Sequence, residues 1–84
     1  MEIKVLGSGC ASCKRLEALA REVVGELEVP AEIEKVTDFK QIMSYGILAT
    51  PGLVIDGEVK SAGRIPNKAE LSSWITSARA AQQA

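Results

Sequence analysis

The stretch VLGSGCASCK, residues 5–14, joins two segments whose apolar residues follow different periods. Before it, Ile3 and Val5 alternate with charged side chains, as in a strand. After it, apolar residues recur at the three- and four-residue spacing of a helix face. Two cysteines, Cys10 and Cys13, lie where one period gives way to the other. We therefore expect Cys10 at the carboxyl end of a strand and the amino end of a helix, where open α/β sheets tend to bind ligands.

The amino end of a helix stabilises a thiolate. Its first backbone N–H groups lack partners within the helix and carry the positive end of the helix dipole. Helix amino termini and Cys-x-x-Cys motifs are both settings in which the pKa of a cysteine is lowered. We predict that Cys10 is the nucleophile and that Cys13, one turn further on and deeper, stays protonated until it is needed. Gly7 and Gly9 allow a sharp turn before the helix and leave the first sulfur uncovered.

A bond between these two cysteines would be a weak structural link. Its loop, from Cys10 to Cys13, is so short that chain entropy contributes roughly 2 kcal/mol, against about 3 kcal/mol for a 15-residue loop. Free cysteine is often simply buried and inert. The position at a strand-to-helix junction favours a reversible redox bond over that alternative.

The composition limits the kinds of protein that this chain can be. Its 84 residues suffice for one domain, 1–84, with 46% hydrophobic and 25% charged residues. The 10 basic and 11 acidic side chains give a net charge of -1, which argues against a nucleic-acid partner. We find no signal-peptide pattern and no apolar run of roughly 20 residues, and so expect a soluble, cytoplasmic protein without membrane contact. Cysteine pairs in that compartment are more often catalytic or metal-binding than structural.

Short strands and helices alternate along the chain. The expected strands are residues 2–6, 31–36, 53–55 and 58–61, the last two joined by an Asp56-Gly57 hairpin turn. The expected helices are residues 12–28, a short helix capped by Asp38 and ended by Gly46, and a last helix opened by an Asn67-Glu70 capping box. The tail, residues 79–84, is expected to fray.

This order, β-α-β-α-β-β-α, predicts an α/β fold with a four-stranded mixed sheet and helices on both faces. We expect the strand order second, first, third, fourth, with the first and last helices on one face and the short helix on the other. Most of the core should come from the apolar stripes of these elements: Ile3, Val5, Leu16, Ala20, Val23, Phe39, Ile42, Leu53, Ile55, Leu71 and Ile75. Met43, Tyr45 and Trp74 are expected to pack there too.

Three motifs together make the chain resemble a minimal thioredoxin-like protein. They are GSGCASCK after the first strand, ATPGLVIDGEV leading into and through the hairpin, and GRIPN before the last helix. The resemblance covers nearly the whole chain and is closest to the small redox-active disulfide proteins of bacteria and archaea. It implies a cis Thr50-Pro51 peptide bond beside the disulfide, where the backbone pairs with an extended substrate. Thr50 and Pro51 are thereby assigned to substrate binding.

The resemblance also implies the chemistry and the partners. The expected enzyme is a protein-disulfide oxidoreductase in which the Cys10 thiolate attacks a substrate disulfide and Cys13 resolves the mixed disulfide. Gly9, Ala11 and Ser12 would border the substrate beside Cys10. No cofactor is expected beyond the cysteine pair. The expected partners are a disulfide-containing protein substrate and a flavin-dependent reductase resembling thioredoxin reductase, with the chain acting as a monomer.

Four departures distinguish the chain from larger members of that family. Gly9 occupies the position of a tryptophan, and Lys4 that of a buried aspartate which assists proton transfer. The residues between the cysteines are Ala11 and Ser12 rather than Gly-Pro or Pro-Tyr, so the redox potential does not carry over. GRIPN replaces the diglycine-aspartate signature with which glutaredoxins hold glutathione, and dependence on glutathione is therefore not expected.

A soft-metal carrier is the alternative, because such modules also place Cys-x-x-Cys between a first strand and a first helix and bind Cu(I) through two thiolates. Their fold, β-α-β-β-α-β, ends in a strand, whereas this chain is expected to end in a helix. They also tend to carry methionine two residues before the first cysteine, where this chain has Ser8. With two cysteines and no histidine, one chain cannot complete a four-ligand structural zinc site, so no metal is assigned.

Overall fold

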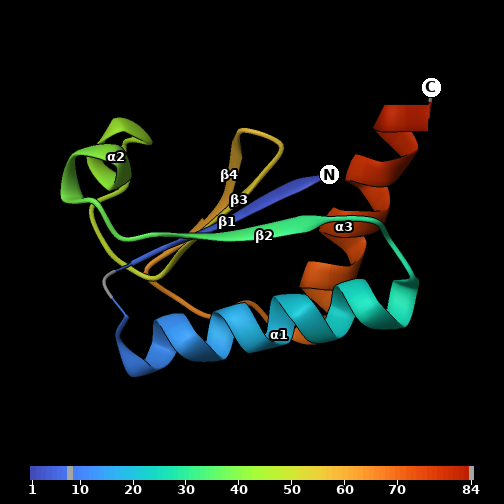
Figure 1. Cartoon of the computed structure of the whole chain (residues 1–84), viewed down its shortest axis with the longest axis horizontal. Coiled ribbons are helices and arrows are strands. Elements are labelled where there is room, and N and C mark those ends of the chain that lie inside the picture. The colour runs from blue at the N-terminus through green and yellow to red at the C-terminus, as the bar shows by residue number, and fades with distance from the viewer. Residues whose placement is uncertain (8, 84) are drawn as a thin grey trace.

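The computed structural model describes the backbone of residues 1–7 and 9–83, and it confirms the expected order of elements (Figure 1). Side chains are described as far as residue 81. The elements are β1 (Glu2–Leu6), α1 (Ala11–Leu27), β2 (Glu32–Val36), α2 (Phe39–Ser44), β3 (Gly52–Ile55), β4 (Glu58–Ala62) and α3 (Lys68–Gln83).

The four strands form one mixed sheet in the order β2-β1-β3-β4, as predicted. β1 runs parallel to β2, with Ile3 opposite Ile33, which is the pairing that a crossover helix produces. β1 runs antiparallel to β3, with Val5 opposite Leu53, and β3 continues through the hairpin into β4. The carboxyl ends of the two parallel strands therefore lie at the same end of the sheet, next to the start of α1.

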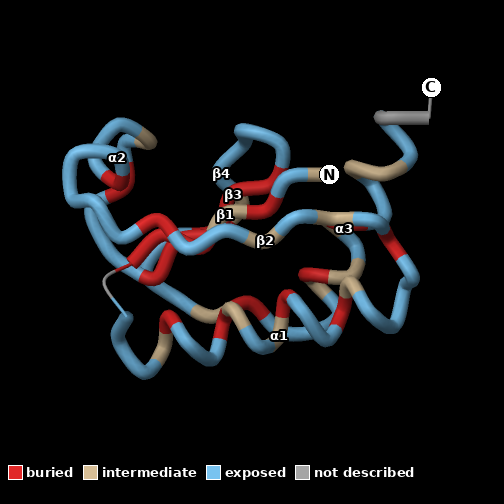
Figure 2. The backbone as a smooth tube through the Cα atoms, in the orientation of Figure 1, coloured by how far each residue is buried: buried red, intermediate tan, exposed pale blue. Residues whose placement is uncertain are grey.

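Buried residues lie along the sheet and in all three helices (Figure 2). They form two clusters, which the alternation of side chains along β1 and β3 places on opposite faces of the sheet. The larger joins the sheet to α1 and α3 and consists of Ile3, Val5, Leu16, Ala20, Val23, Val29, Leu53, Ile55, Leu71 and Ile75. The smaller joins it to α2 and the segment that follows, and consists of Leu6, Val36, Ile42, Ile47 and Val54. Helices thus cover both faces, with α1 and α3 together and α2 opposite, as predicted.

Local signals in the sequence set the ends of the helices. The C-cap of α1 is Glu28, which takes a left-handed conformation with φ 53°, and its N–H donates to the carbonyl of Gly25 at 3.3 Å. The Asp38 side chain caps α2 by accepting from the N–H of Lys40 at 2.9 Å. These ends lie within about two residues of the predicted ones, which is the usual spread of helix assignments.

α3 opens with the reciprocal capping box that was predicted. The Asn67 side chain accepts from the Glu70 N–H at 2.8 Å, and the Glu70 carboxylate accepts from the Asn67 N–H at 3.3 Å. The Arg64 guanidinium also pairs with Glu70 and lies 6.0 Å from the ring centre of Trp74, which is half-buried against the larger core. The helix runs to Gln83 and so includes most of the tail expected to fray, while residue 84 lies outside the described residues.

The predicted burial of two α2 residues is wrong. Phe39 is 72% exposed and Met43 is 44% exposed, although both were expected in the core. α2 has six residues, and only Ile42 among them is buried against the sheet. A helix this short presents a narrow strip to its neighbour, so apolar residues beside that strip remain in contact with water.

Alanine substitutions should separate the core from this exposed face. Leu71→Ala is expected to lower the free energy of unfolding by about 2–5 kcal/mol, because the side chain is fully buried between α3 and the sheet. Phe39→Ala should change it by less than about 0.5 kcal/mol, as for an ordinary surface position. Urea unfolding followed by circular dichroism measures both, and equal losses would show that the helix faces are misassigned.

Candidate active site

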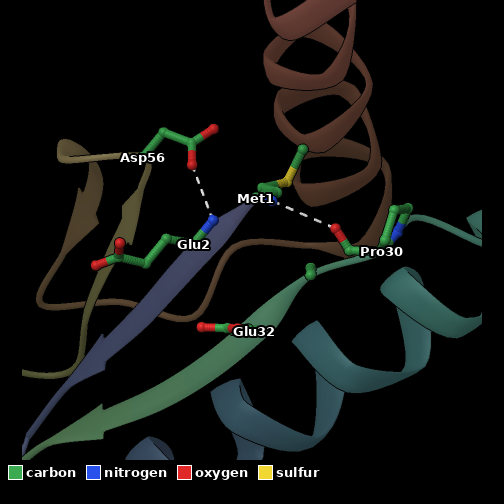
Figure 3. A pocket seen from close by; sticks show the side chains of 6 residues that line it. Met1, Glu2, Pro30, Glu32 and Asp56 are labelled. Carbon is green, nitrogen blue, oxygen red and sulfur yellow. Dashed lines mark hydrogen bonds between the residues drawn. The ribbon is translucent and has the colours of Figure 1, made fainter.

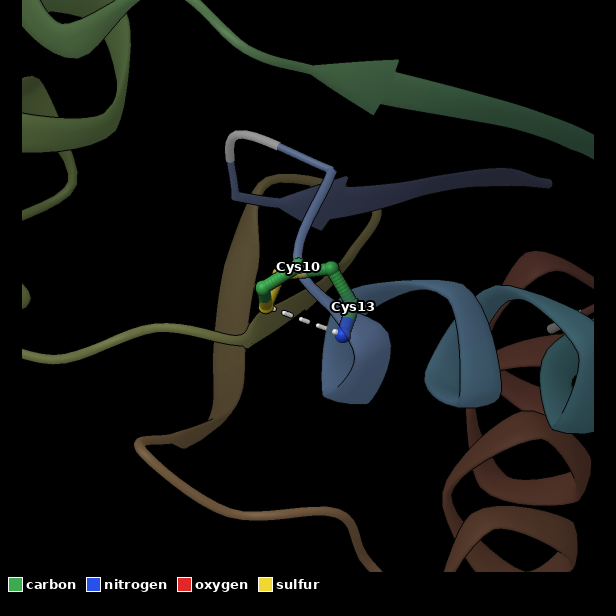
Figure 4. The surroundings of a disulfide bond; sticks show 2 residues. All are labelled: Cys10 and Cys13. Atoms are coloured by element: carbon green, nitrogen blue, oxygen red, sulfur yellow. Dashed lines mark hydrogen bonds between the residues drawn. A yellow bond between two sulfur atoms is a disulfide. The ribbon is translucent and has the colours of Figure 1, made fainter.

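The two cysteines form a disulfide at the junction of β1 and α1 (Figure 4). Cys10 is the N-cap residue of α1, with the extended backbone typical of that position (φ -65°, ψ 164°). Its Sγ accepts a hydrogen bond from the Cys13 N–H at 3.2 Å, while its carbonyl accepts from the Lys14 N–H at 3.0 Å. The first sulfur thus takes the place of the usual capping oxygen and faces the unpaired N–H groups of the helix start.

The two sulfurs differ in their access to solvent. Cys10 is exposed, whereas Cys13 is only 5% exposed and belongs to the buried residues of α1. An incoming molecule can therefore reach the Cys10 side of the bond, while Cys13 is covered by the protein. This is the arrangement expected for a nucleophile and a resolving cysteine, whose roles remain predictions.

Gly7 makes room for the buried sulfur. A Cβ placed on Gly7 would collide with the Sγ of Cys13, and it would lie 3.7 Å from the Cβ of Thr50. The Gly7 N–H donates to the Val36 carbonyl at 2.9 Å, which holds the glycine at the end of the sheet. The sequence predicts a turn at Gly7 but not that this glycine packs on the Cys13 sulfur. Spacing along a chain does not show which residue lies against a given side chain.

Gly9 keeps the other side of the site open. It has φ 85°, a left-handed conformation that favours glycine, and nothing lies within 4 Å of where its Cβ would be. This agrees with the predicted sharp turn and uncovered first sulfur. Ser8, used above in weighing the metal-carrier alternative, lies outside the described residues.

The remaining predicted residues lie in two segments. Ala11 and Ser12 occupy the first turn of α1, where Ala11 is exposed and Ser12 is half-buried. The Thr50-Pro51 peptide bond is cis, with Thr50 exposed and Pro51 buried, and the Pro51 carbonyl accepts from the Gly63 N–H at 2.8 Å. Thr50 approaches the disulfide around Gly7, whereas Gly9, Ala11 and Ser12 flank Cys10 along the chain.

Three basic side chains lie near the site in the sequence: Lys4 in β1, and Lys14 and Arg15 in α1. Lys4 forms an ion pair with Glu2 at 3.0 Å. Hydrogen bonds to Glu2 and Tyr45 raise the pKa of Lys4, so it remains a cation at neutral pH. It alternates along β1 with Ile3 and Val5, which pack toward α1, and so faces the other side of the sheet. Among the described residues, Lys14 and Arg15, which follow the cysteines, form no ion pair.

The part of the chain that the structure describes contains no group of three or more histidine, cysteine, aspartate or glutamate side chains that could hold a metal ion. Cys10 and Cys13 are therefore the two thiol ligands that the metal-binding alternative would have to use, with their disulfide reduced. That alternative stays a prediction, although its β-α-β-β-α-β fold differs from the observed order, which ends in α3.

A hollow lies at the end of the sheet opposite to the disulfide (Figure 3). Its volume is about 730 Å³, and Met1, Glu2, Pro30 and Asp56 are among the residues that line it. Two hydrogen bonds cross it, from the amino terminus to the Pro30 carbonyl at 3.3 Å and from the Glu2 N–H to Asp56 at 2.8 Å. None of its lining residues belongs to the predicted site.

Comparisons with known proteins agree with this geometry. Residues 1–76 match a family model described as a thioredoxin domain. A protein of Methanothermobacter thermautotrophicus named thioredoxin is 48% identical over 76 residues, which cover 90% of this chain and 99% of the relative. A protein of Methanocaldococcus jannaschii with the same name is 35% identical over 77 residues, which cover 87% of this chain and 88% of the relative.

None of the helices in the described part of the chain has the length and apolar character that a membrane span requires.

The contact between Gly7 and Cys13 can be tested with two glycine variants. Gly7→Ala is expected to lower the unfolding free energy of the oxidised protein by about 1–3 kcal/mol, because the added methyl group must displace the buried sulfur or the backbone. Gly25→Ala is the matched control, since nothing lies within 4 Å of its Cβ position in α1, and it should raise stability by about 0.5–1 kcal/mol. Denaturant unfolding of both would contradict the packing argument if Gly7→Ala were also stabilising.

Proposed function

Since the chain belongs to the thioredoxin family, we propose that it reduces disulfide bonds in substrate proteins through the Cys10–Cys13 pair. Thiol–disulfide oxidoreduction in general follows from the family and from the paired cysteines. The observation that carries the more specific proposal is the asymmetry of the pair, an exposed sulfur at a helix start bonded to a buried one.

The proposed reaction has two exchange steps. In the reduced protein, the Cys10 thiolate attacks one sulfur of a substrate disulfide, forming a Cys10–substrate bond and releasing the other substrate sulfur as a thiolate. Cys13 then gives up its proton and attacks the Cys10 sulfur, forming the Cys10–Cys13 disulfide and releasing the second substrate thiolate. The substrate gains two electrons, and the protein pair loses two.

The environment of each cysteine supports its proposed role. The Cys13 N–H donates to the Cys10 sulfur, and this donor together with the helix dipole favours a negative charge at that atom. Burial of Cys13 removes its sulfur from water, which disfavours the thiolate. Cys13 therefore stays a protonated thiol until the second step. The first attack is thereby directed to the sulfur that a substrate can reach.

We assign substrate docking to the edge formed by Thr50 and Pro51 and to the turn formed by Gly9, Ala11 and Ser12. The support for this assignment is the exposure of Thr50 next to the Gly7 position, together with the open space around Gly9. Pro51 has no N–H, and its carbonyl already accepts from the Gly63 N–H, so we assign main-chain pairing with the substrate to Thr50. An extended substrate segment can add to such an edge by main-chain hydrogen bonds.

A flavin-dependent reductase is the proposed electron donor, with the chain acting as a cytoplasmic monomer and carrying no cofactor of its own. The support is the GRIPN segment, which lacks the diglycine-aspartate signature of glutathione-dependent relatives. Oxidation of NADPH by a thioredoxin-reductase-type flavoenzyme, measured with the oxidised protein as electron acceptor, should proceed faster than reduction of the same protein by glutathione. Faster reduction by glutathione than by the flavoenzyme would indicate a glutaredoxin-type protein instead.

The two cysteines should react with an alkylating agent at different pH. In the reduced protein, Cys10 is expected to be modified by iodoacetamide well below about pH 8, because the helix start stabilises its thiolate. Cys13 should be modified slowly throughout, because its sulfur is buried. Mass spectrometry of quenched samples gives each profile, and matching profiles centred near about pH 8.5 would remove the helix-start argument.

Single serine variants should separate the attacking cysteine from the resolving one. Cys13→Ser is expected to accumulate a mixed disulfide with a disulfide-bonded substrate protein, because the second step is lost. Cys10→Ser should accumulate at least about tenfold less, since the remaining thiol is buried. Non-reducing electrophoresis measures both, and trapping by Cys10→Ser alone would reverse the assigned roles.

A further inference from the structure

An apolar groove opens beside Thr50, between α2 and the segment that leads into Pro51. Its volume is about 320 Å³, and its walls include Phe39, Met43 and Leu48, which are 72%, 44% and 94% exposed. Large apolar side chains gathered at one exposed hollow are uncommon on a protein that binds nothing there. The groove therefore has the character of an interaction surface.

The groove continues directly from the proposed substrate edge. Thr50 is one of its lining residues, and the same residue approaches the disulfide around Gly7. A substrate segment whose cysteine reacts with Cys10 and whose backbone runs along Thr50 would bring a neighbouring side chain to the groove. The volume is near the lower end of the range for ligand pockets, about 300–1,000 Å³, and is large enough for a bulky apolar side chain.

Three cations without an ion pair lie in the two helices near this end of the molecule, together with one carboxylate, Asp38, which caps α2. Lys14 and Arg15 follow the cysteines in α1, and Lys40 follows the groove residue Phe39 in α2. Within residues 1–7 and 9–81, no ion pair involves any of the three. Acidic residues such as Glu28 and Glu32 lie at the opposite end, where α1 ends and β2 begins (Figure 1).

We propose that the groove binds a bulky apolar side chain next to the reacting cysteine of the substrate, in a segment whose flanking charges are acidic. The proposal rests on the function proposed above and specifies which disulfides the site prefers. Apolar burial supplies the attraction at the groove, and the cations steer the acidic flanks toward Cys10. A second copy of this chain fits less well, because a twofold contact centred on Phe39 would bring Lys40 of one copy toward Lys40 of the other.

The preference can be measured with short peptides that differ at two places. Each carries one cysteine blocked as a pyridyl disulfide, with leucine or serine beside it and glutamate or lysine as flanking charges. Attack by the Cys10 thiolate on the peptide sulfur forms the mixed disulfide and expels thiopyridone, whose absorbance gives the second-order rate. The reduced parent protein should react roughly tenfold faster with the leucine-glutamate peptide than with the serine-glutamate peptide. Exchange of glutamate for lysine should slow the reaction, and added salt should narrow that difference.

Two leucine variants assign the preference to the groove. Leu48→Ser should lower the rate with the leucine-glutamate peptide about tenfold more than it lowers the rate with dithiodipyridine, a small uncharged disulfide. Leu27→Ser is the matched control, because Leu27 is also exposed, at 39%, but lies at the far end of α1. It should leave all of these rates unchanged.

The outcomes separate this proposal from the function on which it rests. A reduced parent that fails to react with dithiodipyridine would overturn the function itself. A parent that reacts with dithiodipyridine but shows equal rates with leucine and serine peptides would overturn the groove alone. So would a loss of leucine preference that is the same in Leu48→Ser and Leu27→Ser.

Discussion

The contact between Gly7 and the sulfur of Cys13 is the constraint on which the site depends. It fixes the end of β1 against the first turn of α1, because no side chain separates the strand from the buried sulfur. The rest of α1 is held by Leu16, Ala20 and Val23, which lie in the larger core. With the helix held in this way, its first N–H groups face one exposed position, and the residue there is Cys10.

Most of the fold could be predicted because its signals are local. The Asp56-Gly57 turn and the Asn67-Glu70 box each specify one junction, and the rules for crossover connections then give the strand order. Burial on α2 could not be predicted in the same way. Periodicity places Phe39 on an apolar face, but it does not show how much of that face a six-residue helix can cover.

The position of the cysteines could be predicted from the sequence, but the residues that pack around them could not. The position of Cys10 follows from the change of period at the strand-to-helix junction, which one sequence is enough to show. The fit of Gly7 onto Cys13 depends on two backbones meeting in space, and the groove at Leu48 depends on a loop whose sequence has no regular pattern. Both features require the three-dimensional arrangement, and both concern how a substrate is received rather than which atom reacts.

The central claim is that Cys10 and Cys13 form a reversible redox pair. Its most direct test is the equilibrium reduction potential of the pair, obtained by titrating the protein in thiol–disulfide buffers and counting blocked thiols by mass spectrometry. The account predicts a reversible two-electron transition between about -270 mV and about -120 mV, the range spanned by thioredoxin and stronger oxidants. A potential below about -300 mV, as in structural disulfides of secreted proteins, would contradict it.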